Sequence, residues 1–523
     1  MKNDTKKNLK LPQNLNQKFI IRKDLTPTRR FEIAFKAYQI QQMVNSYGEM
    51  TKLAIQYKIC RAFLYILLNI LMSNISQIFS PQEQEKKITK KELISRMLLH
   101  RMVGKNSIES ISEIMNYDQL KNSSVGSISQ SLSAIGALLP TVQSIPVDKV
   151  VEITATSDEI FIGNRPILIT LEPKSLTILS IELAKSRDES TWSEHFTKIE
   201  LAGEIEIINI VTDGGSGLCS AISDRGILWQ PDTYHAIAHR LGKWVHKLEQ
   251  RAYKRIAIEY ERKRVLASAK SKKVINKRRY KYNKAREETL KVIEIYDNFL
   301  YLYSSIIKEL QPFKSSGELR DREIAKENIE VALELIESIN DEHINKQVAT
   351  IKNILPELLN YFEEAKKSIK KCKRLGIDDD IITTLTLAWQ WNKRLIKVKK
   401  DKRRREKAKS ERLFYLEYAK AILGDEYKKT KEMLFDELDN IIQSSSMVEN
   451  INSILRPYLN NSKNQITQEF LNLFAFYHNH RRFKEGKRKG KTPMELITGK
   501  EQDKDWIELL TDFIEKVEPS FFL

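Results

Sequence analysis

VVEITATSDEIFIGNRPILITLEPKSLTILSIEL, residues 150–183, contains three runs rich in β-branched residues, separated by turn signals at GNR and EPKS. Short runs of this kind with turns between them predict three antiparallel strands. An amphipathic helix is expected around residues 191–200, and the apolar run IEIINIV at 205–211 follows it as a fourth strand. Because a helix that joins two strands makes a parallel crossover, the order predicts a mixed sheet.

Helical sequence surrounds this sheet. The chain has only 17 glycines and 13 prolines among 523 residues, about half the usual share. Almost no strand signal occurs between residues 240 and 444, where we expect an all-helical insertion. The predicted fold class is therefore α/β, an RNase H-like mixed sheet core with an N-terminal helix-turn-helix region and a large all-α insertion, helix-dominated overall.

The stretch GEMTKLAIQYKICRAFLYIL at residues 48–67 has the spacing of a helix-turn-helix. Ala54 is small where the two helices would cross, and Ile59 is apolar in the turn. This arrangement would bring Lys58 and Arg61 near a DNA groove. An ordinary helical hairpin is the alternative.

A weaker signal of the same kind lies at residues 107–136. Ile108, Ile111 and Ile114 form one helical stripe, and a second helix is expected to start near Ser124. Two helical units in tandem would suit a protein that recognises a long DNA site. A plain helical linker is equally compatible with the pattern.

The composition is strongly basic, with 88 lysines and arginines against 69 acidic residues and a net charge of +19. Such an excess favours a polyanionic partner, although a generic basic protein has the same composition. Cys60, Cys219 and Cys372 are too far apart in the sequence for a zinc knuckle or a disulfide framework, so we expect a reducing compartment. The N-terminus lacks an apolar signal core, and the most apolar stretch, 63–72, is too short to cross a bilayer. We therefore expect a cytoplasmic location, at the nucleoid where a DNA partner would be found, and no membrane partner.

Two aspartates follow apolar strands of the predicted sheet. Asp158 is expected at the end of the first strand, and Asp213 ends the fourth, next to two glycines. Because these strands would be neighbours, the two carboxylates are expected to converge. Carboxylate oxygens are the ligands that Mg²⁺ prefers, and two such ions can cleave a phosphodiester bond. A third carboxylate is expected from a helix packed against the sheet.

The sequence resembles bacterial insertion-sequence transposases of the DDE class. The segments that resemble them are TSDEIFIGNRPIL around Asp158, VTDGGSGL around Asp213, DTYHAIAHRL, MVENINSILRPYL around Glu449, and FYHNHRRFKEGKRKGKTPMELITG. The resemblance implies an RNase H-like fold and cleavage at transposon ends with two Mg²⁺ ions, for which Mn²⁺ is an acceptable substitute. It also implies joining of the freed 3′-OH to target DNA. Some of these enzymes carry a helical insertion between the second Asp and the Glu, which agrees with the long gap here.

By this resemblance the catalytic, metal-binding triad is Asp158, Asp213 and Glu449, with Asn452 and Arg456 beside the glutamate. Glu469 is the rival third carboxylate, and Glu159 is adjacent to Asp158. Glu495 follows Pro493 and is better explained as a residue at a helix start.

Asp232, His235 and His239 have a spacing that could place both histidines on one helix face as metal ligands. No further Cys or His lies nearby in the sequence, which disfavours zinc. We expect His235 either to lie close to the scissile phosphate or to hold a catalytic carboxylate in place. A structural histidine with satisfied hydrogen bonds is the alternative.

A basic segment at residues 481–491 follows the predicted catalytic helix. Contacts to the DNA backbone are its expected role, and a solvated loop is the alternative. The residues predicted to make these contacts are Arg481, Arg482, Lys484, Lys487, Arg488 and Lys489. In the insertion, Trp389 and Trp391 precede a basic run; stacking on an unpaired base is conceivable, but buried helix packing is favoured.

The predicted organisation follows the chain from a flexible arm to a helical tail. Its segments are the arm (1–28), the helix-turn-helix (29–80), a second helical region (81–145), the sheet core (146–240), the helical insertion (241–443), the remainder of the core (444–500) and the tail (501–523). The predicted function is a DNA transposase that acts on terminal inverted repeats and target DNA as a homo-oligomer. Another RNase H-like DNA nuclease and a catalytically silent, domesticated DNA-binding regulator are the alternatives.

Overall fold

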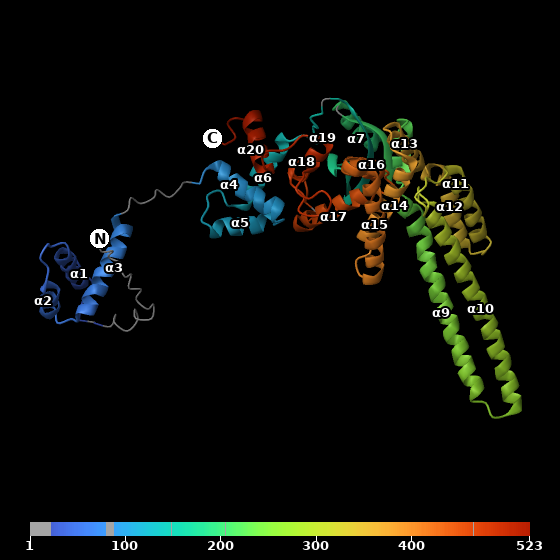
Figure 1. The fold of residues 1–523 in the computed structure, drawn as a ribbon, viewed down its shortest axis with the longest axis horizontal. Coiled ribbons are helices and arrows are strands. Elements are labelled where there is room, and N and C mark those ends of the chain that lie inside the picture. Colours follow the sequence, from blue (N-terminus) through green and yellow to red (C-terminus); the bar gives the residue numbers. More distant parts are fainter. Residues whose placement is uncertain are drawn as a thin grey trace. The chain divides into compact units, whose positions relative to one another are not determined.

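A computed structural model describes residues 22, 24–79, 88–147, 149–203, 205–463 and 465–522. The chain forms two compact units, Met1–Thr89 and Lys90–Leu523. Most of the predicted arm at 1–28 lies outside the described residues, as does the boundary predicted after residue 80. Figure 1 follows the elements along the chain.

The first unit is a small helical domain with its own apolar core. Its helices are α1 (Pro27–Gln41), α2 (Glu49–Gln56) and α3 (Arg61–Phe79). The helix, turn and helix predicted at residues 48–67 are present, and α2 and the following stretch of α3 bend by 99°. Such an angle is typical of helix-turn-helix motifs. Ala54 is buried, and its carbonyl accepts a hydrogen bond from the amide of Ile59 at 2.9 Å.

No helix in the described ranges is by itself both long enough and apolar enough to cross a bilayer. α2 and the first part of α3 reach the length and apolar composition of a membrane span only when the two helices, which are bent against each other, are taken together.

The second unit contains one five-stranded mixed sheet, as the sequence predicts. The strands are β1 (Val151–Ile162), β2 (Arg165–Glu172), β3 (Thr177–Leu183), β4 (Ile205–Thr212) and β5 (Leu228–Pro231). Their spatial order is β3-β2-β1-β4-β5. The first three strands are antiparallel, whereas β4 is parallel to both β1 and β5. The fifth strand was not predicted, because LWQP is short and lacks β-branched residues.

Helices cover both faces of the sheet. On one face, α7 (Glu189–Leu201) and α8 (Ser216–Asp224) contribute a core around Trp192 and Phe196. On the other face, the strand residues share a core with α17 (Ser446–Asn461) and α18 (Gln468–His480). Because both faces are covered, the middle of β2 is buried without alternation, which explains its continuous apolar sequence.

The second helical region is not a separate module in the part that the structure describes. Its helices are α4 (Lys90–Leu98), α5 (Ile108–Tyr117) and α6 (Val125–Leu138), and they share one core with α17, α18 and α20 (Trp506–Val517). The predicted helix start at Ser124 is present as a side-chain cap, and Ser107 caps α5 in the same way. The buried faces of these helices thus belong to the sheet domain, and DNA reading by their exposed faces stays a prediction.

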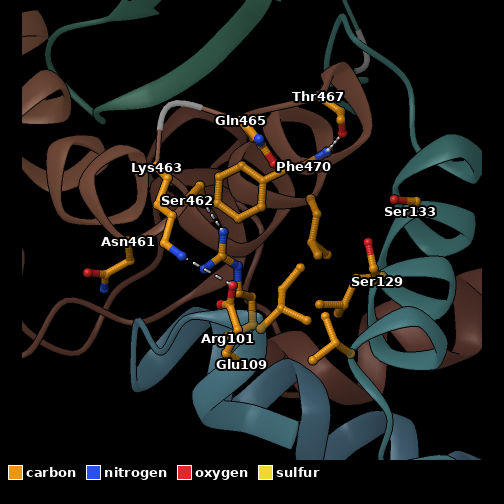
Figure 2. A pocket seen from close by; sticks show the side chains of 14 residues that line it. Arg101, Glu109, Ser129, Ser133, Asn461, Ser462, Lys463, Gln465, Thr467 and Phe470 are labelled. Atoms are coloured by element: carbon orange, nitrogen blue, oxygen red, sulfur yellow. Dashed lines mark hydrogen bonds and ion pairs between the residues drawn. The ribbon is translucent and has the colours of Figure 1, made fainter.

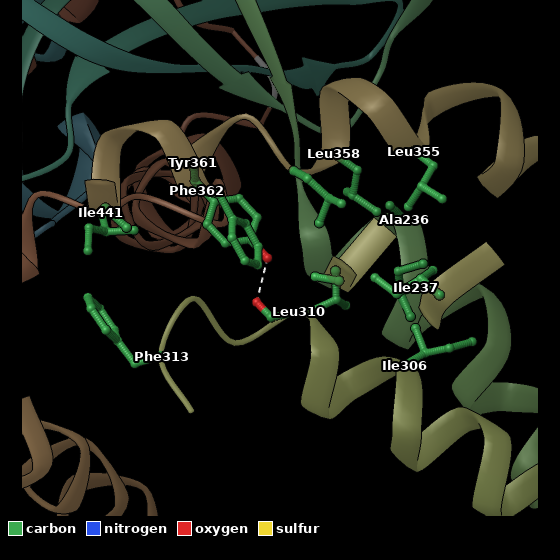
Figure 3. Close-up of a cluster of buried hydrophobic side chains, with 14 of the residues drawn as sticks. Ala236, Ile237, Ile306, Leu310, Phe313, Leu355, Leu358, Tyr361, Phe362 and Ile441 are labelled. Atoms are coloured by element: carbon green, nitrogen blue, oxygen red, sulfur yellow. Dashed lines mark hydrogen bonds between the residues drawn. The ribbon is translucent and has the colours of Figure 1, made fainter. Parts of the chain in front are cut away.

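The predicted all-helical insertion is present and has its own core. Figure 3 shows part of this core, in which the buried Tyr361 hydroxyl donates a hydrogen bond to the carbonyl of Leu310. Trp389 is buried there and donates a hydrogen bond to Asp439, so the favoured packing role for this tryptophan is confirmed. The insertion comprises α9 (Arg240–Ala267), α10 (Lys272–Glu309), α11 (Arg322–Glu337), α12 (Glu342–Leu358), α13 (Tyr361–Arg374), α14 (Asp379–Lys397), α15 (Lys402–Leu423) and α16 (Tyr427–Asp439).

Candidate active site

Asp158 and Asp213 lie on neighbouring parallel strands. The last paired residues of β1 and β4 are Thr156 and Val211, and each aspartate follows its paired residue by two positions. Asp158 lies within β1, opposite Ile169 of β2, rather than at the strand end where it was expected. The parallel register nevertheless brings both aspartates to the same edge of the β1–β4 pair.

The electrostatics of Asp158 show that the other carboxylates are close. Burial is the main cause that raises the pKa of Asp158 to about 7, and the charge of Asp213 is the second. Glu159 and Glu449 contribute in the same direction, whereas the backbone hydrogen bond from Glu159 opposes them. A carboxyl group with a raised pKa beside other carboxylates is typical of functional sites.

Glu449 comes to this site from α17, a helix that packs against β1. Glu449, Asp158, Asn452 and Arg456 line one surface groove. The Asn452 amide donates a hydrogen bond to Asp158 Oδ2 at 2.9 Å. The other Asp158 oxygen accepts from the backbone amide of Glu159 at 2.9 Å. Asn452, which was expected beside Glu449, therefore orients the Asp158 carboxylate.

His235 holds Glu449. It lies on a short π-helical turn, η3 (Tyr234–His239), and its Nε2 is 2.8 Å from Glu449 Oε1. Burial alone would lower the pKa of His235, but the hydrogen bond to Glu449 and the nearby charges of Asp232 and Asp213 raise it above its usual value. The sequence-based expectation that His235 holds a catalytic carboxylate agrees with this contact.

Asp232 joins the turn that carries His235 to Ser445 at the end of the insertion, a role that the sequence pattern did not predict. One of its oxygens accepts hydrogen bonds from the amides of Tyr234 and His235, at 2.7 and 3.1 Å. The other accepts from the amide and hydroxyl of Ser445, both at 2.7 Å. Asp232 is buried, so these bonds join the start of the insertion to its end. The Asp-x-x-His pattern alone does not reveal this contact, because Ser445 is far away in the sequence.

The rival carboxylates lie elsewhere or have other partners. Glu469 is in the first turn of α18 and does not line the groove, and a hydrogen bond with Thr467 lowers its pKa. Glu495 forms a capping box with Thr492, as expected for a residue at a helix start. Glu159 forms an ion pair of 2.6 Å with Arg187. Glu449 is thus the glutamate that the fold brings to Asp158.

The basic segment is only partly available for a ligand. Arg482 pairs with Glu495 at 2.9 Å, and Lys487 pairs with Asp439 at 3.0 Å. Arg488 donates to the carbonyls of Lys174 and Pro173, at 2.8 and 3.0 Å. These three side chains therefore have partners within the protein, and their contacts to DNA stay a prediction.

The other predicted DNA contacts of this segment, Arg481, Lys484 and Lys489, have no carboxylate partner among the described residues. Arg481 lies over the ring of Tyr477. Lys484 and Lys489 are exposed, and no ion-pair partner for either occurs in the described part of the chain. In the first unit, Lys58 has the positive φ of 48° in the turn and Arg61 opens α3, both exposed, where a helix-turn-helix presents its DNA contacts.

A separate cavity lies between α5, α6 and the connection from α17 to α18 (Figure 2). The buried Arg101 guanidinium is central to it and donates to the carbonyl of Asn106 and to Ser462, at 2.8 and 2.7 Å. It also lies 4.7 Å from the centre of the Phe470 ring. These contacts hold the end of α17 against α5, and none of the triad carboxylates lines the cavity.

The chemistry of the donor set fits a hard divalent cation. The carboxylates of Asp158 and Glu449 line the groove, and the buried Asn452 Oδ1 has no hydrogen-bond partner among the described residues. The carboxylates are not gathered as a ready ligand set, since within the described residues no three His, Cys, Asp or Glu side chains lie close enough to hold a metal. The hydrogen bond with His235 occupies Glu449 Oε1, an oxygen that a metal ion would need as a ligand.

Comparison with known proteins identifies no relative: no family model matches this chain, and no curated protein matches its sequence.

Proposed function

We propose that this protein is a DDE-type DNA transposase with an RNase H-like core. The observation that supports this best is the groove in which Glu449 faces Asp158, with the charge of Asp213 acting on the same carboxyl group. Two of these residues come from adjacent parallel strands and the third from a helix packed on the sheet. The strand order β3-β2-β1-β4-β5 is the arrangement expected of an RNase H-like sheet.

Asp158, Asp213 and Glu449 would hold Mg²⁺ in this enzyme. Bound Mg²⁺ activates the attacking oxygen and stabilises the leaving oxygen of a phosphodiester. Asn452 keeps one Asp158 oxygen oriented, and His235 keeps Glu449 at the groove until the metal is bound. The two hydrogen bonds from Ser445 to Asp232, called the clamp from here on, hold the turn of His235 next to the start of α17, which carries Glu449 and Asn452.

The groove also provides positive charge for the DNA backbone. Arg456 lines it and is exposed, without an ion-pair partner among the described residues. In the proposed reaction, water attacks phosphorus at a transposon end and the bond to the 3′ oxygen breaks. The freed 3′-OH then attacks a phosphodiester of the target DNA; a new P–O bond forms to the transposon end, and the bond to the 3′ oxygen of the target breaks, which leaves a 3′-OH on the target strand. Two DNA ends must meet in this reaction, so the proposal includes a homo-oligomer assembled on terminal inverted repeats.

The test uses the DNA that flanks the gene, which should contain terminal inverted repeats bordered by short direct duplications. The purified protein is incubated with this DNA and Mg²⁺. We predict that Asp213→Asn and Glu449→Gln abolish strand cleavage while DNA affinity changes less than about threefold, because a carboxylate in the metal site contributes to the transition state rather than to DNA binding.

Glu469→Gln is the matched control, since it removes the rival carboxylate from a helix outside the groove. It should cleave at the wild-type rate. Wild-type cleavage by Asp213→Asn would refute the triad. Specific end binding without cleavage by any form would favour the alternative of a DNA-binding regulator.

A further inference from the structure

The α9–α10 hairpin projects from the rest of the second unit as an arm (green in Figure 1). Its contributions to the core of the insertion end at Leu248 on α9 and resume at Ile295 on α10. Between these positions the buried residues are small, Ala252, Ala285 and Thr289, and they let the two helices pack closely on each other. At 1.5 Å per residue, α9 continues for roughly 24 Å beyond Ala252.

The outer part of the arm, residues 254–286, is intensely basic. It contains fourteen lysines and arginines, and its only acidic residues are Glu259 and Glu261. Glu261 pairs with Arg264, and Glu288, just outside this range, pairs with Arg255. Most of the positive charge therefore has no carboxylate partner in the described residues, which is costly in an isolated protein and favourable against a polyanion.

Part of this charge is arranged as a stripe on one face of α10. Lys273, Lys277, Lys281 and Lys284 follow one another at helical spacings of four, four and three residues, so they lie on the same side of the helix. All four are exposed, and within the described chain none has an ion-pair partner. The stripe is roughly 16 Å long, about half a turn of duplex DNA.

The shape and charge of the arm identify its partner. A second copy of the arm would place like charges against each other at the tip, which opposes self-association. Duplex DNA presents one negative charge per roughly 1.7 Å along its axis, so more phosphates lie along the length of the stripe than its four lysines can neutralise. We propose that the outer α9–α10 arm is a DNA-binding surface that grips the duplex backbone, away from the catalytic groove and without reading bases. The choice of DNA among polyanions rests on the proposed function.

The experiment compares two fourfold variants of the full-length protein. The arm variant replaces Lys273, Lys277, Lys281 and Lys284 by Gln, which has a similar helix propensity. The control variant makes the same change at four exposed lysines of α13 and α16, which also have no ion-pair partner in the described chain: Lys366, Lys370, Lys428 and Lys429. Affinity for a duplex of random sequence is measured in EDTA over a range of salt concentrations, and circular dichroism verifies that helix content is unchanged.

We expect the arm variant to bind about 10- to 100-fold more weakly near 0.15 M salt, and its salt slope to fall by about 0.9 for each phosphate that it no longer neutralises. The control variant should stay within about twofold of the wild type. Equal losses of affinity in both variants, or wild-type affinity in the arm variant, would overturn the proposal. The same two variants are assayed with structured RNA and with phosphatidylserine vesicles. A loss of affinity for either of these with unchanged affinity for duplex DNA would also overturn the proposal.

Failure of the arm proposal and failure of the transposase proposal are distinguishable. Binding in EDTA does not depend on cleavage, and Asp213→Asn leaves the arm intact. If Asp213→Asn still cleaves DNA, the triad is wrong whatever the arm does. If the arm variant binds normally and the triad variants are inactive, only the arm proposal is refuted.

Discussion

Asp158 has the most strongly perturbed carboxyl group of the candidate site, and its protonation links the site to stability. Its pKa is about 7 in the folded protein, against an ordinary value of 3.8. A raised folded pKa means that the folded state holds the proton more tightly than the unfolded chain does. The resulting stabilisation is complete below about pH 4 and is lost as the pH rises through 7.

Asp158→Asn should therefore stabilise the protein at pH 8, by on the order of 1–3 kcal/mol, because it removes one charge from a crowded group of carboxylates. At pH 4 the gain should vanish. Thermal unfolding at both pH values measures the effect. Mg²⁺ should raise the melting temperature of the wild type at pH 8 and leave that of the variant unchanged.

The control for this prediction is Asp224→Asn, at the exposed end of α8, which should alter neither the pH dependence nor the response to Mg²⁺. A variant of Asp158 that is less stable than the wild type at pH 8 would contradict the assignment of a crowded carboxylate site.

At the scale of elements, the crossing of α6 and α18 shows how a helix from the N-terminal region becomes part of the sheet domain. Gly136 lies at this crossing, where an added Cβ would be 2.1 Å from the Glu469 carbonyl oxygen. Asn472 of α18 donates hydrogen bonds to the carbonyls of Gly136 and Leu139, at 3.2 and 2.9 Å. The close approach of the two helix backbones therefore depends on a glycine. The side-chain amide of Asn472 provides hydrogen bonds for the carbonyl groups at the end of α6.

Gly136→Ala should destabilise the protein by about 1–3 kcal/mol, because overpacking against backbone outweighs the gain of about 1 kcal/mol in helix propensity. Urea unfolding measures the difference. Gly126→Ala is the matched control in the same helix, since nothing lies within 4 Å of its added Cβ. It should be neutral or slightly stabilising, and equal destabilisation by both changes would contradict the close approach at Gly136.

At the scale of the whole molecule, the division into two units predicts independent folding. One apolar core lies entirely within residues 25–75, and the others lie entirely beyond residue 90. A fragment of residues 90–523 should fold, with a melting temperature within about 5 °C of the corresponding transition of the full chain. Differential scanning calorimetry of both proteins tests this, and an insoluble fragment or a much lower melting temperature would show that the first unit is required.

The local pattern of the sequence determined most of the elements of this protein. Alternating and β-branched runs predicted β1 to β4, helical periodicity predicted the helix-turn-helix and the insertion, and a capping residue predicted the helix start at Ser124. These features depend on neighbouring residues, so the sequence expresses them directly. The pair of Asp158 and Asp213 was also predictable, since adjacent parallel strands bring their ends together.

Tertiary structure alone decided which distant residues meet. Glu449 rather than Glu469 faces Asp158, because the clamp between Asp232 and Ser445 returns the chain to the sheet after more than 200 inserted residues. The structural roles of Arg482 and Arg488 likewise depend on partners that sequence spacing does not identify. Contacts over such separations are set by packing of whole elements, and local periodicity contains no information about them.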